Sequence, residues 1–363
     1  MKQTDSGAPG SARHFIIPVF IMNRGCPHRC TFCNQTITAG NFPAEITREY
    51  FDREVSAYLA WNKQQSENVE IAFYGGNFTG VEPAYQEKLL TWAHAYIEKK
   101  LVQAIRISTR PDYISEDQLP LLKQYGVRTV EIGAQSFVDS VLRRVQRGHN
   151  ADDIERAVSV LKEYGLRTGL HLMAGLPGDT KEGWIESLNK TVCLRPDTAR
   201  IHPVTVFRDT VLAEEFHRGQ YRPLELPQAV EWCALAWEML SAVGIRVIRM
   251  GLQVTPEMEK AGAILAGPVH PAFGSLVLSR VFYLHTIRFL GELPDDVREV
   301  RFRLSPRDMS DFRGLNNFNI KAIKKLYPRV HLIIESVPGK KRGAISAETD
   351  TGALMNLQIP GIR

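Results

Sequence analysis

Short runs of β-branched and apolar residues alternate, over the first two thirds of the chain, with longer stretches in which apolar positions recur every three or four residues. The first pattern predicts buried strands and the second predicts amphipathic helices. The predicted strands are Ile16–Met22, Val69–Phe73, Ala104–Thr109, Val127–Gly133, Leu166–Met173 and Ala199–Val204. The predicted helices are Glu45–Trp61, Pro83–Lys99, Glu116–Tyr125, Ala151–Tyr164, Lys181–Thr191 and Pro227–Val243.

Six consecutive strand–helix units predict an α/β fold with a parallel sheet and right-handed crossovers. An open sheet and a barrel share this pattern, and both place functional loops at the carboxyl ends of the strands. Pro18 interrupts the first predicted strand, and proline is tolerated mainly on an edge strand. An edge strand favours a partial (β/α)6 barrel of the TIM type over a closed eight-stranded one.

The repeat stops after Gly251, where a helix near Pro271–Leu290 leads into a mixed C-terminal α+β extension. We therefore expect a disordered tail over residues 1–14, a partial barrel over 15–253 and a basic extension over 254–363. The Gly- and Pro-bounded segment Gly267–Arg280 opens that helix at Pro271. Its role stays open.

Composition changes the picture only by exclusion. The 363 residues are 44% hydrophobic and 23% charged, which is ordinary for a globular protein. No run approaches the roughly 18 apolar residues of a membrane span, and the first residues, MKQTDSGAPGSAR, lack the apolar stretch of a secretory signal. We expect a cytoplasmic protein with no membrane partner.

The positive charge is concentrated near the C-terminus. Twelve Lys and Arg stand against five Asp and Glu between Asp296 and Gly343, a surplus of seven. Such a bias fits either a solvated face or a nucleic-acid partner. The candidate RNA-binding residues are Lys321, Lys324 and Lys325 on a predicted helix, and Lys340, Lys341 and Arg342 in a predicted loop.

The clearest chemical signal is RGCPHRCTFCNQ, directly after the first predicted strand. Cys26, Cys30 and Cys33 are spaced C-x3-C-x2-C, so each thiolate can bind one iron of a [4Fe–4S] cubane and leave the fourth iron open. The alternative is zinc, with His28 as a fourth ligand, but zinc sites usually pair ligands from two separated segments. Cys193 and Cys233 are isolated and are expected in the core.

Polar and glycine residues follow the other predicted strands, where such sheets bind ligands. Gly75 and Gly76 allow close approach of backbone to a ligand, and Ser108, Gln135 and Arg147 follow later strands. Taken singly, Gln135 and Arg147 fit ordinary surface positions. Together with the cysteine triplet they indicate a pocket for S-adenosylmethionine (SAM).

The motifs CPHRCTFCNQ, YGGNF, STRPDY, EIGAQSF, RRVQRGH and HLMAGLPGDT, in this order, resemble the radical SAM superfamily. Within it they resemble the radical SAM domain of the elongator catalytic subunit and, more distantly, oxygen-independent coproporphyrinogen oxidase. The resemblance covers residues Phe15 to Gln253. It implies a partial barrel that holds a [4Fe–4S] cluster and SAM, with an electron donor such as flavodoxin or ferredoxin.

The resemblance also implies roles for single residues. Phe32 would stack near the adenine, the Gly75–Gly76 strip would take the methionine amino group, and Ser108 and Gln135 would face the ribose. Arg147 would pair with the carboxylate, which a guanidinium clamps well.

The sequence departs from the family pattern at several places. Asn77 replaces an acidic residue of many relatives beside the methionine amine. His171 replaces the aspartate of the porphyrinogen enzymes and matches the elongator-like pattern. The first two cysteines are closer than in the elongator subunit, and nothing after Gly251 reads as its glycine-rich acetyl-CoA loop, which leaves the use of acetyl-CoA open.

Three functions follow from these observations. The first is modification of an RNA base, in tRNA, with the basic extension binding the RNA. The second is radical chemistry on a small molecule such as a porphyrinogen. The third is a SAM-binding iron–sulfur scaffold without turnover. His202, at the end of the last predicted strand, is the candidate substrate-facing residue.

Overall fold

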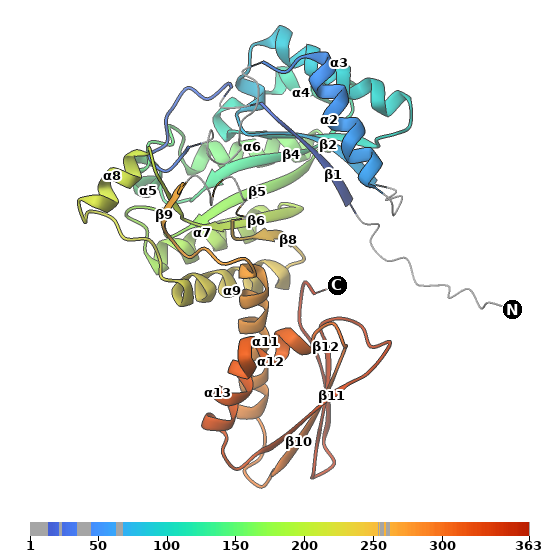
Figure 1. The fold of residues 1–363 in the computed structure, drawn as a ribbon, viewed down its shortest axis with the longest axis vertical. Coiled ribbons are helices and arrows are strands. Elements are labelled where there is room, and N and C mark those ends of the chain that lie inside the picture. Colours follow the sequence, from blue (N-terminus) through green and yellow to red (C-terminus); the bar gives the residue numbers. More distant parts are fainter. Residues whose placement is uncertain are drawn as a thin grey trace, which may run out of the picture. The chain divides into compact units, whose positions relative to one another are not determined.

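The computed structural model describes residues 14–21, 24–34, 45–62, 68–252, 254, 258 and 262–362. Its larger sheet has the order β1-β2-β3-β4-β5-β6-β8 and is the predicted partial barrel (Figure 1). The strands are β1 (His14–Phe20), β2 (Asn68–Tyr74), β3 (Ala104–Thr109), β4 (Val127–Gln135), β5 (Arg167–Ala174), β6 (Thr198–Pro203) and β8 (Arg246–Met250). The predicted α/β fold is confirmed.

Strand β1 stands at one end of this order and, among the described strands, pairs with β2 alone, in parallel from His14 opposite Asn68. Pro18 therefore lies on an edge strand, as predicted, where its missing N–H breaks no central ladder. At the other end, β8 pairs in parallel with β6 and adds a seventh strand to the six that the sequence predicts. The sequence did not predict this strand, because Arg246–Met250 includes two arginines and so is not a continuous apolar run.

The chain divides into two compact units: residues 1–135 with 145–171, and residues 136–144 with 172–363. The predicted tail lies outside the described residues, except that His14 already begins β1. The predicted boundary at Gln253 also lies outside them and stays a prediction.

In the first unit, one face of the sheet packs against helices α2 (Arg48–Trp61) and α3 (Pro83–Glu98). Phe51 of α2 stacks on Phe73 of β2, with ring centroids 6.3 Å apart, and Phe73 stacks on Phe78 at 5.0 Å. Because side chains alternate along a strand, Glu70 and Tyr74 point to the opposite, concave face of the sheet. This face carries the polar residues described below.

The remaining elements of the first unit connect these strands. They are η1 (Phe78–Gly80), η2 (Pro111–Tyr113), η3 (Glu116–Gln118), α4 (Leu119–Gln124) and α6 (Ala151–Glu163). The predicted helix Glu116–Tyr125 is thus a 3₁₀ turn followed by a short α-helix. Asn150 caps α6, accepting from the Asp153 N–H while Asp153 accepts from the Asn150 N–H. This capping box fixes where the helix begins and orients the chain just before it.

The second unit contains the rest of the barrel and the C-terminal α+β extension. Its helices are α5 (Asp139–Arg144), α7 (Lys181–Leu194), α8 (Val211–His217), α9 (Leu226–Ala242), α11 (Phe273–Gly291), α12 (Met309–Arg313) and α13 (Phe318–Leu326), with η4 (Leu315–Asn317). A small sheet has the order β11-β10-β12-β13, and β7 (Val206–Phe207) pairs with β9 (Ile264–Ala266). The small-sheet strands are β10 (Glu299–Leu304), β11 (His331–Ser336), β12 (Ala344–Thr349) and β13 (Leu354–Gln358).

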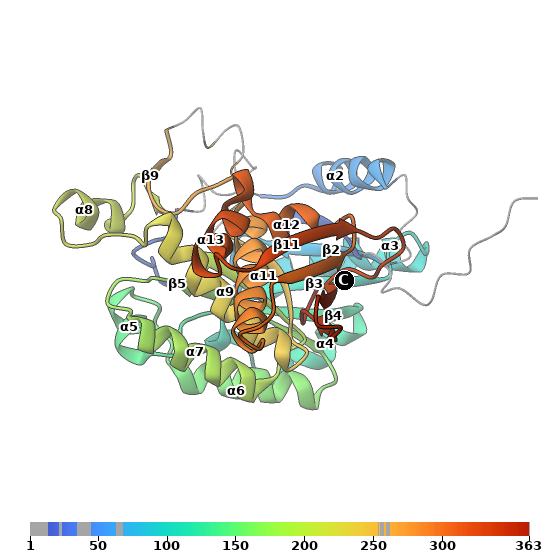
Figure 2. The same cartoon turned by 90° about the horizontal axis from the view of Figure 1, so that it is seen from below.

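Helices α11, α12 and α13 cluster beside this small sheet (Figures 1 and 2). Phe282, Phe302 and Phe312 form their common aromatic core, with Phe302 and Phe312 centred 5.3 Å apart. Helix α11 begins at Phe273, so Pro271 lies in the turn before it rather than in its first turn. Among the described residues, no helix is both long enough and apolar enough to cross a bilayer.

Candidate active site

The loop that follows β1 carries the three predicted iron ligands. Cys30 is buried, Cys26 is partly buried and Cys33 is exposed, and no disulfide bond joins any of the three to a described residue. The Thr31 N–H donates to the Val145 carbonyl over 3.2 Å, and the Cys33 N–H donates to the Cys30 carbonyl over 3.0 Å. The cysteine loop, residues 24–34, is therefore held against the segment that precedes α6.

Close backbone packing explains the glycines on both sides of this loop. The Asn77 N–H donates to the Arg24 carbonyl over 2.9 Å. A Cβ added to Gly76 would lie 2.7 Å from the Arg24 carbonyl oxygen, and a Cβ added to Gly25 would lie 2.1 Å from that of Asn77. Gly75 adopts a φ of 81°, a conformation that favours glycine. The YGGNF motif thus fits the end of β2 to the cysteine loop.

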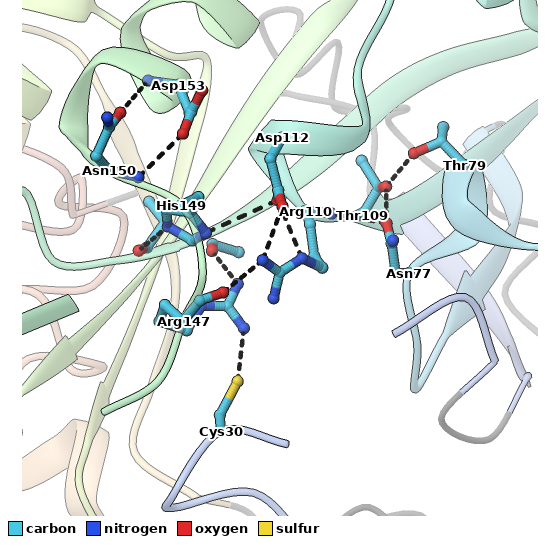
Figure 3. A network of polar contacts seen from close by, with 12 residues as sticks. Cys30, Asn77, Thr79, Thr109, Arg110, Asp112, Arg147, His149, Asn150 and Asp153 are labelled. Carbon is cyan, nitrogen blue, oxygen red and sulfur yellow. Dashed lines mark hydrogen bonds and ion pairs between the residues drawn. The ribbon is translucent and has the colours of Figure 1, made fainter. Parts of the chain in front are cut away.

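Asn77 ties the cysteine loop to the end of β3. Its side chain is fully buried, and its Nδ2 donates to the Gly25 carbonyl over 2.7 Å. Its Oδ1 accepts from Thr109 Oγ1 at 2.6 Å and from the Arg110 N–H at 3.1 Å, and Thr79 bonds to Thr109 in turn (Figure 3). Both ends of this amide are engaged within the protein, so its side chain positions the loop.

Arg147 reaches from the segment before α6 to the cysteine loop. Its Nη1 donates to Cys30 Sγ over 3.2 Å, and its Nη2 donates to the Gly133 carbonyl over 2.6 Å (Figure 3). The Arg110 guanidinium donates to the Arg147 carbonyl. Arg147 Nε is buried without a hydrogen-bond partner among the described residues. One donor of this guanidinium therefore remains for a ligand.

Arg110, Asp112 and His149 surround Arg147. Arg110 is nearly buried and binds both carboxylate oxygens of Asp112, at 3.0 and 2.9 Å. His149 Nε2 lies 3.2 Å from the Ala134 carbonyl, so Nε2 carries the proton. Burial, followed by the charge of Arg147, lowers the pKa of His149 to about 3. This imidazole is neutral at physiological pH.

Gln135 ends β4 in a strained backbone conformation, with a φ of 71°. It is 6% exposed, and its Oε1 is buried without a hydrogen-bond partner among the described residues. A Cβ added to Gly133 would lie 2.9 Å from Gln135 Nε2 and 3.1 Å from Arg147 Nη2. Gly133 thus makes room for two side chains that the sequence assigns to one ligand.

The other predicted SAM residues lie in the same unit. Ser108 is partly buried near the end of β3, Phe32 is partly buried in the cysteine loop, and His171 is partly buried in β5. His28 is exposed, and a Cβ on Gly148 would lie 2.3 Å from its Nε2. His28 therefore lies against the Gly148 backbone, as expected for a loop residue.

The concave face also carries a buried ion-pair cluster that the sequence analysis missed. Arg106 binds Glu70 Oε2 at 2.7 Å and Glu131 Oε1 at 2.6 Å, and the Tyr74 hydroxyl donates to Glu131 at 3.2 Å. Burial acts to lower the pKa of Arg106, but Glu131 and Glu70 raise it above its usual range. Single charged residues inside apolar strands were the available signal. Ser108 follows Arg106 by two residues and so shares its face.

His202 lies in β6, in the second unit. Burial, with Arg249 and Arg200, lowers its pKa to about 3, so this histidine is neutral. Its predicted role toward a substrate stays a prediction.

The six predicted RNA-binding residues fall where expected, on α13 and in the loop between β11 and β12. Arg342, however, binds Asp308 at 2.8 Å and Asp311 at 3.5 Å. Lys340 donates to Ser346 Oγ at 2.6 Å. Lys341 and the three lysines of α13 are exposed.

The donor set fits a [4Fe–4S] cluster and SAM. Three thiols that no disulfide bond joins to a described residue share one loop. Arg147 contacts this loop at Cys30, and both its Nε and the Oε1 of the nearby Gln135 lack a hydrogen-bond partner among the described residues. Burial and the nearby Cys30 raise the pKa of the Cys26 thiol, which Arg110 and Arg147 oppose. Over the described part of the chain, no three His, Cys, Asp or Glu side chains are already arranged around a metal position.

Comparison with known proteins gives the same assignment. The model of the radical SAM superfamily matches residues 20–191, and the model of the Radical_SAM C-terminal domain matches residues 196–282. The tRNA uridine(34) acetyltransferase of Methanocaldococcus infernus is 27% identical over 302 residues, which cover 68% of this chain and 57% of the relative. Elongator complex protein 3 of Saccharomyces cerevisiae is 29% identical over 176 residues, covering 43% and 32%.

Among solved structures, the archaeal Methanocaldococcus infernus Elp3 with an N-terminal deletion is similar in fold. Its TM-score is 0.56 at 21% identity, and the match covers 76% of this chain and 63% of that one. The chain spans little more than half the length of the tRNA uridine(34) acetyltransferases that it matches. The radical SAM family uses a [4Fe–4S] cluster and SAM, and its members are enzymes. With its cysteine loop, its partial barrel and both family models in agreement, the chain belongs to the radical SAM superfamily.

Proposed function

We propose that this radical SAM enzyme modifies a base of tRNA. The observation that carries the cofactor part is Arg147, which spans Cys30 Sγ and the Gly133 carbonyl beside the unpaired Gln135 oxygen. Relatives named tRNA uridine(34) acetyltransferase and Elongator complex protein 3 support the tRNA part. Acetyl transfer is outside the proposal, because the chain spans only part of those relatives.

In this proposal Cys26, Cys30 and Cys33 bind three irons of the cluster. Arg147 would bind the SAM carboxylate through its unpaired Nε and its charge, since a guanidinium pairs well with a carboxylate. When bound and reduced, the cluster with SAM would supply radical chemistry that begins with removal of a hydrogen atom from a substrate.

Other residues would orient the cofactor and the loop. Gln135 would donate or accept at the ribose, with Ser108 on the neighbouring strand, and Phe32 would lie near the adenine. Asn77 holds the cysteine loop to β3 through its buried amide, and the Gly75–Gly76 backbone would meet the methionine amino group. The neutral His149 keeps further positive charge away from Arg147.

The test is turnover with and without RNA. Protein reconstituted anaerobically with iron and sulfide, then reduced with dithionite, is incubated with SAM and tRNA from a strain that lacks the gene. We expect tRNA to stimulate 5′-deoxyadenosine formation and a new modified nucleoside to appear by mass spectrometry. Cys30→Ala protein should give neither product.

A negative result also has a clear meaning. If 5′-deoxyadenosine forms at the same rate without tRNA and no nucleoside changes, the tRNA proposal fails and a small-molecule substrate, such as a porphyrinogen, takes its place. If Cys26→Ala, Cys30→Ala and Cys33→Ala bind as much iron as the wild type, the ligand assignment fails as well. The expectation that Cys193 lies in the core was wrong, because the structure exposes it, whereas Cys233 is buried. Cys193→Ala should keep the full iron content, because this cysteine is exposed and distant in sequence from the loop.

A further inference from the structure

A strained turn joins α12 to α13. Gly314 has a φ of 72°, and the asparagines Asn316 and Asn317 have φ values of 53° and 60°. Two successive non-glycine residues in the left-handed region are uncommon and cost free energy. Such a conformation persists only where its surroundings hold it.

Asn319 holds this turn in place. Its buried Nδ2 donates to the Ser279 carbonyl at 2.9 Å, to Ser279 Oγ at 3.0 Å and to the Phe312 carbonyl at 3.1 Å. A Cβ on Gly314 would lie 3.0 Å from Asn319 Cγ. These contacts hold the backbone of the turn in one conformation.

This rigid turn exposes large apolar side chains. Leu315 is 62% exposed and Phe318 is 67% exposed, although aromatic residues usually bury most of their surface. On α13, residues three and four apart are neighbours, so Phe318 adjoins Lys321, and Lys321 adjoins Lys325. An exposed ring and two lysines share one helix face.

The surrounding charge is positive. Residues 312–334 contain five Lys and Arg and no Asp or Glu. The three lysines of α13 make no ion pair with a described residue, whereas on the nearby sheet Arg301 and Arg303 bind Glu335, and Arg303 also binds Glu348. The free cations therefore lie on the helix rather than on the sheet.

We propose that the basic aromatic turn, formed by Leu315, Phe318, Lys321 and Lys325, binds an unpaired strand of RNA. A base stacks on the Phe318 ring, and Lys321 and Lys325 contact the phosphates on either side of it. Every base offers a flat face to an aromatic ring, and lysines beside it neutralise the backbone. This proposal rests on the proposed function and assigns its RNA-binding surface.

The same residues fit a membrane less well. Helix α13 is nine residues long, and its residues Asn319 and Ile323 are buried in the unit. Amphipathic helices that lie in a bilayer bury an apolar face in the lipid, and this helix has turned its inner face to the protein. What remains outside is one ring and isolated leucines among lysines.

Binding of a fluorescent unpaired 12-nucleotide RNA, measured by anisotropy at several salt concentrations, separates stacking from charge. Phe318→Leu should weaken binding about 5-fold to 100-fold at every salt concentration and leave the salt slope unchanged, because only stacking is lost. Phe318→Trp should bind as well as the wild type. Lys321→Ala and Lys325→Ala should each reduce the slope of log affinity against log salt by about 0.7.

Lys181→Ala is the matched control, because Lys181 is exposed in the same unit but lies outside the turn and outside the predicted RNA-binding residues. Leu354→Ala is the control for an exposed apolar side chain, 63% exposed on β13. Thermal unfolding of each variant should coincide with the wild type, since all of these side chains lie at the surface.

The proposal is overturned if Phe318→Leu binds RNA like the wild type, or if Lys181→Ala lowers the salt slope as much as Lys321→Ala. It is also overturned if wild-type protein sediments with phosphatidylglycerol vesicles in a Phe318-dependent way while RNA binding is independent of Phe318. These binding readouts need no cluster or SAM. If these binding tests fail while tRNA still stimulates turnover, the RNA-binding role of the turn is rejected and the proposed function stands.

Discussion

The side-chain Nδ2 of Asn77 donates to the carbonyl oxygen of Gly25 over 2.7 Å, immediately before the first cysteine of the loop. The other end of the same amide accepts from Thr109 and from the Arg110 N–H. One fully buried side chain therefore sets the distance between the cysteine loop and β3.

Replacing Asn77 should damage the fold and the cluster to different degrees. Asn77→Ala leaves buried polar groups unpaired, so it should lower the free energy of unfolding by about 2–4 kcal/mol in urea titrations. Asn77→Asp keeps the acceptor for Thr109 but loses the donor to Gly25, so it should bind less iron after anaerobic reconstitution. Full iron content in Asn77→Asp would contradict this role. Thr91→Ala, at the surface of α3, is the neutral control.

Arg147 should contribute to SAM affinity through a charged hydrogen bond. Arg147→Ala should weaken SAM binding by about 1.5–3 kcal/mol in anaerobic calorimetry. Arg147→Lys keeps the charge but not the planar fork that reaches both Cys30 and Gly133, so it should also bind weakly. Arg156→Ala, on the exposed face of α6, should bind SAM normally. Unchanged affinity in Arg147→Ala would show that another group binds the carboxylate.

Substitutions of Gln135 should separate its effect on stability from its effect on SAM binding. Gln135→Ala and Gln135→Gly both remove the unpaired amide, so both should lower SAM affinity. Only glycine relieves the positive φ, so Gln135→Gly should be more stable than Gln135→Ala by about 1 kcal/mol. Urea unfolding of the two variants checks the difference. Equal stabilities would mean that the backbone at residue 135 is not strained.

His149 predicts a loss of stability in acid. The folded pKa of His149 is about 3, below the unfolded value of about 6.5. Between these two pH values, His149 is protonated in the unfolded chain and neutral in the folded chain. Its contribution is therefore complete above about pH 6.5 and falls as the pH drops, costing about 2 kcal/mol by pH 5. His149→Gln should remove this part of the pH dependence of unfolding. His217→Gln, at an exposed histidine of α8, is the matched control.

Arg342 and Lys341 are neighbours with opposite expected effects. Asp308 is fully buried, accepts from the Gly343 N–H at 2.7 Å and binds Arg342 at 2.8 Å. Arg342→Ala leaves that carboxylate with one partner fewer and should lower the free energy of unfolding by about 1–3 kcal/mol. Lys341→Ala should leave stability unchanged. If folded Arg342→Ala protein bound RNA more weakly than the wild type, Arg342 would contact a phosphate after all.

The sequence by itself determined the elements and the ligand spacing. Strand β3 begins and ends at the predicted residues, and Pro18 correctly marked an edge. The spacing of the three cysteines was enough to indicate a metal-binding loop. These are local properties, because apolar period, proline geometry and ligand spacing depend on residues a few positions apart.

The tertiary structure alone decided which distant groups meet. Arg147 and Cys30 are 117 positions apart, and Arg342 and Asp308 are 34 apart. Similar local patterns made Arg342 look like the lysines of α13, yet the fold neutralises the arginine and leaves the lysines exposed. Likewise, Gly76 and Asn77 pack the cysteine loop against the sheet. The spacing of residues within the motif does not predict these contacts. Pairing and burial depend on the whole path of the chain, so they enter only when its elements pack.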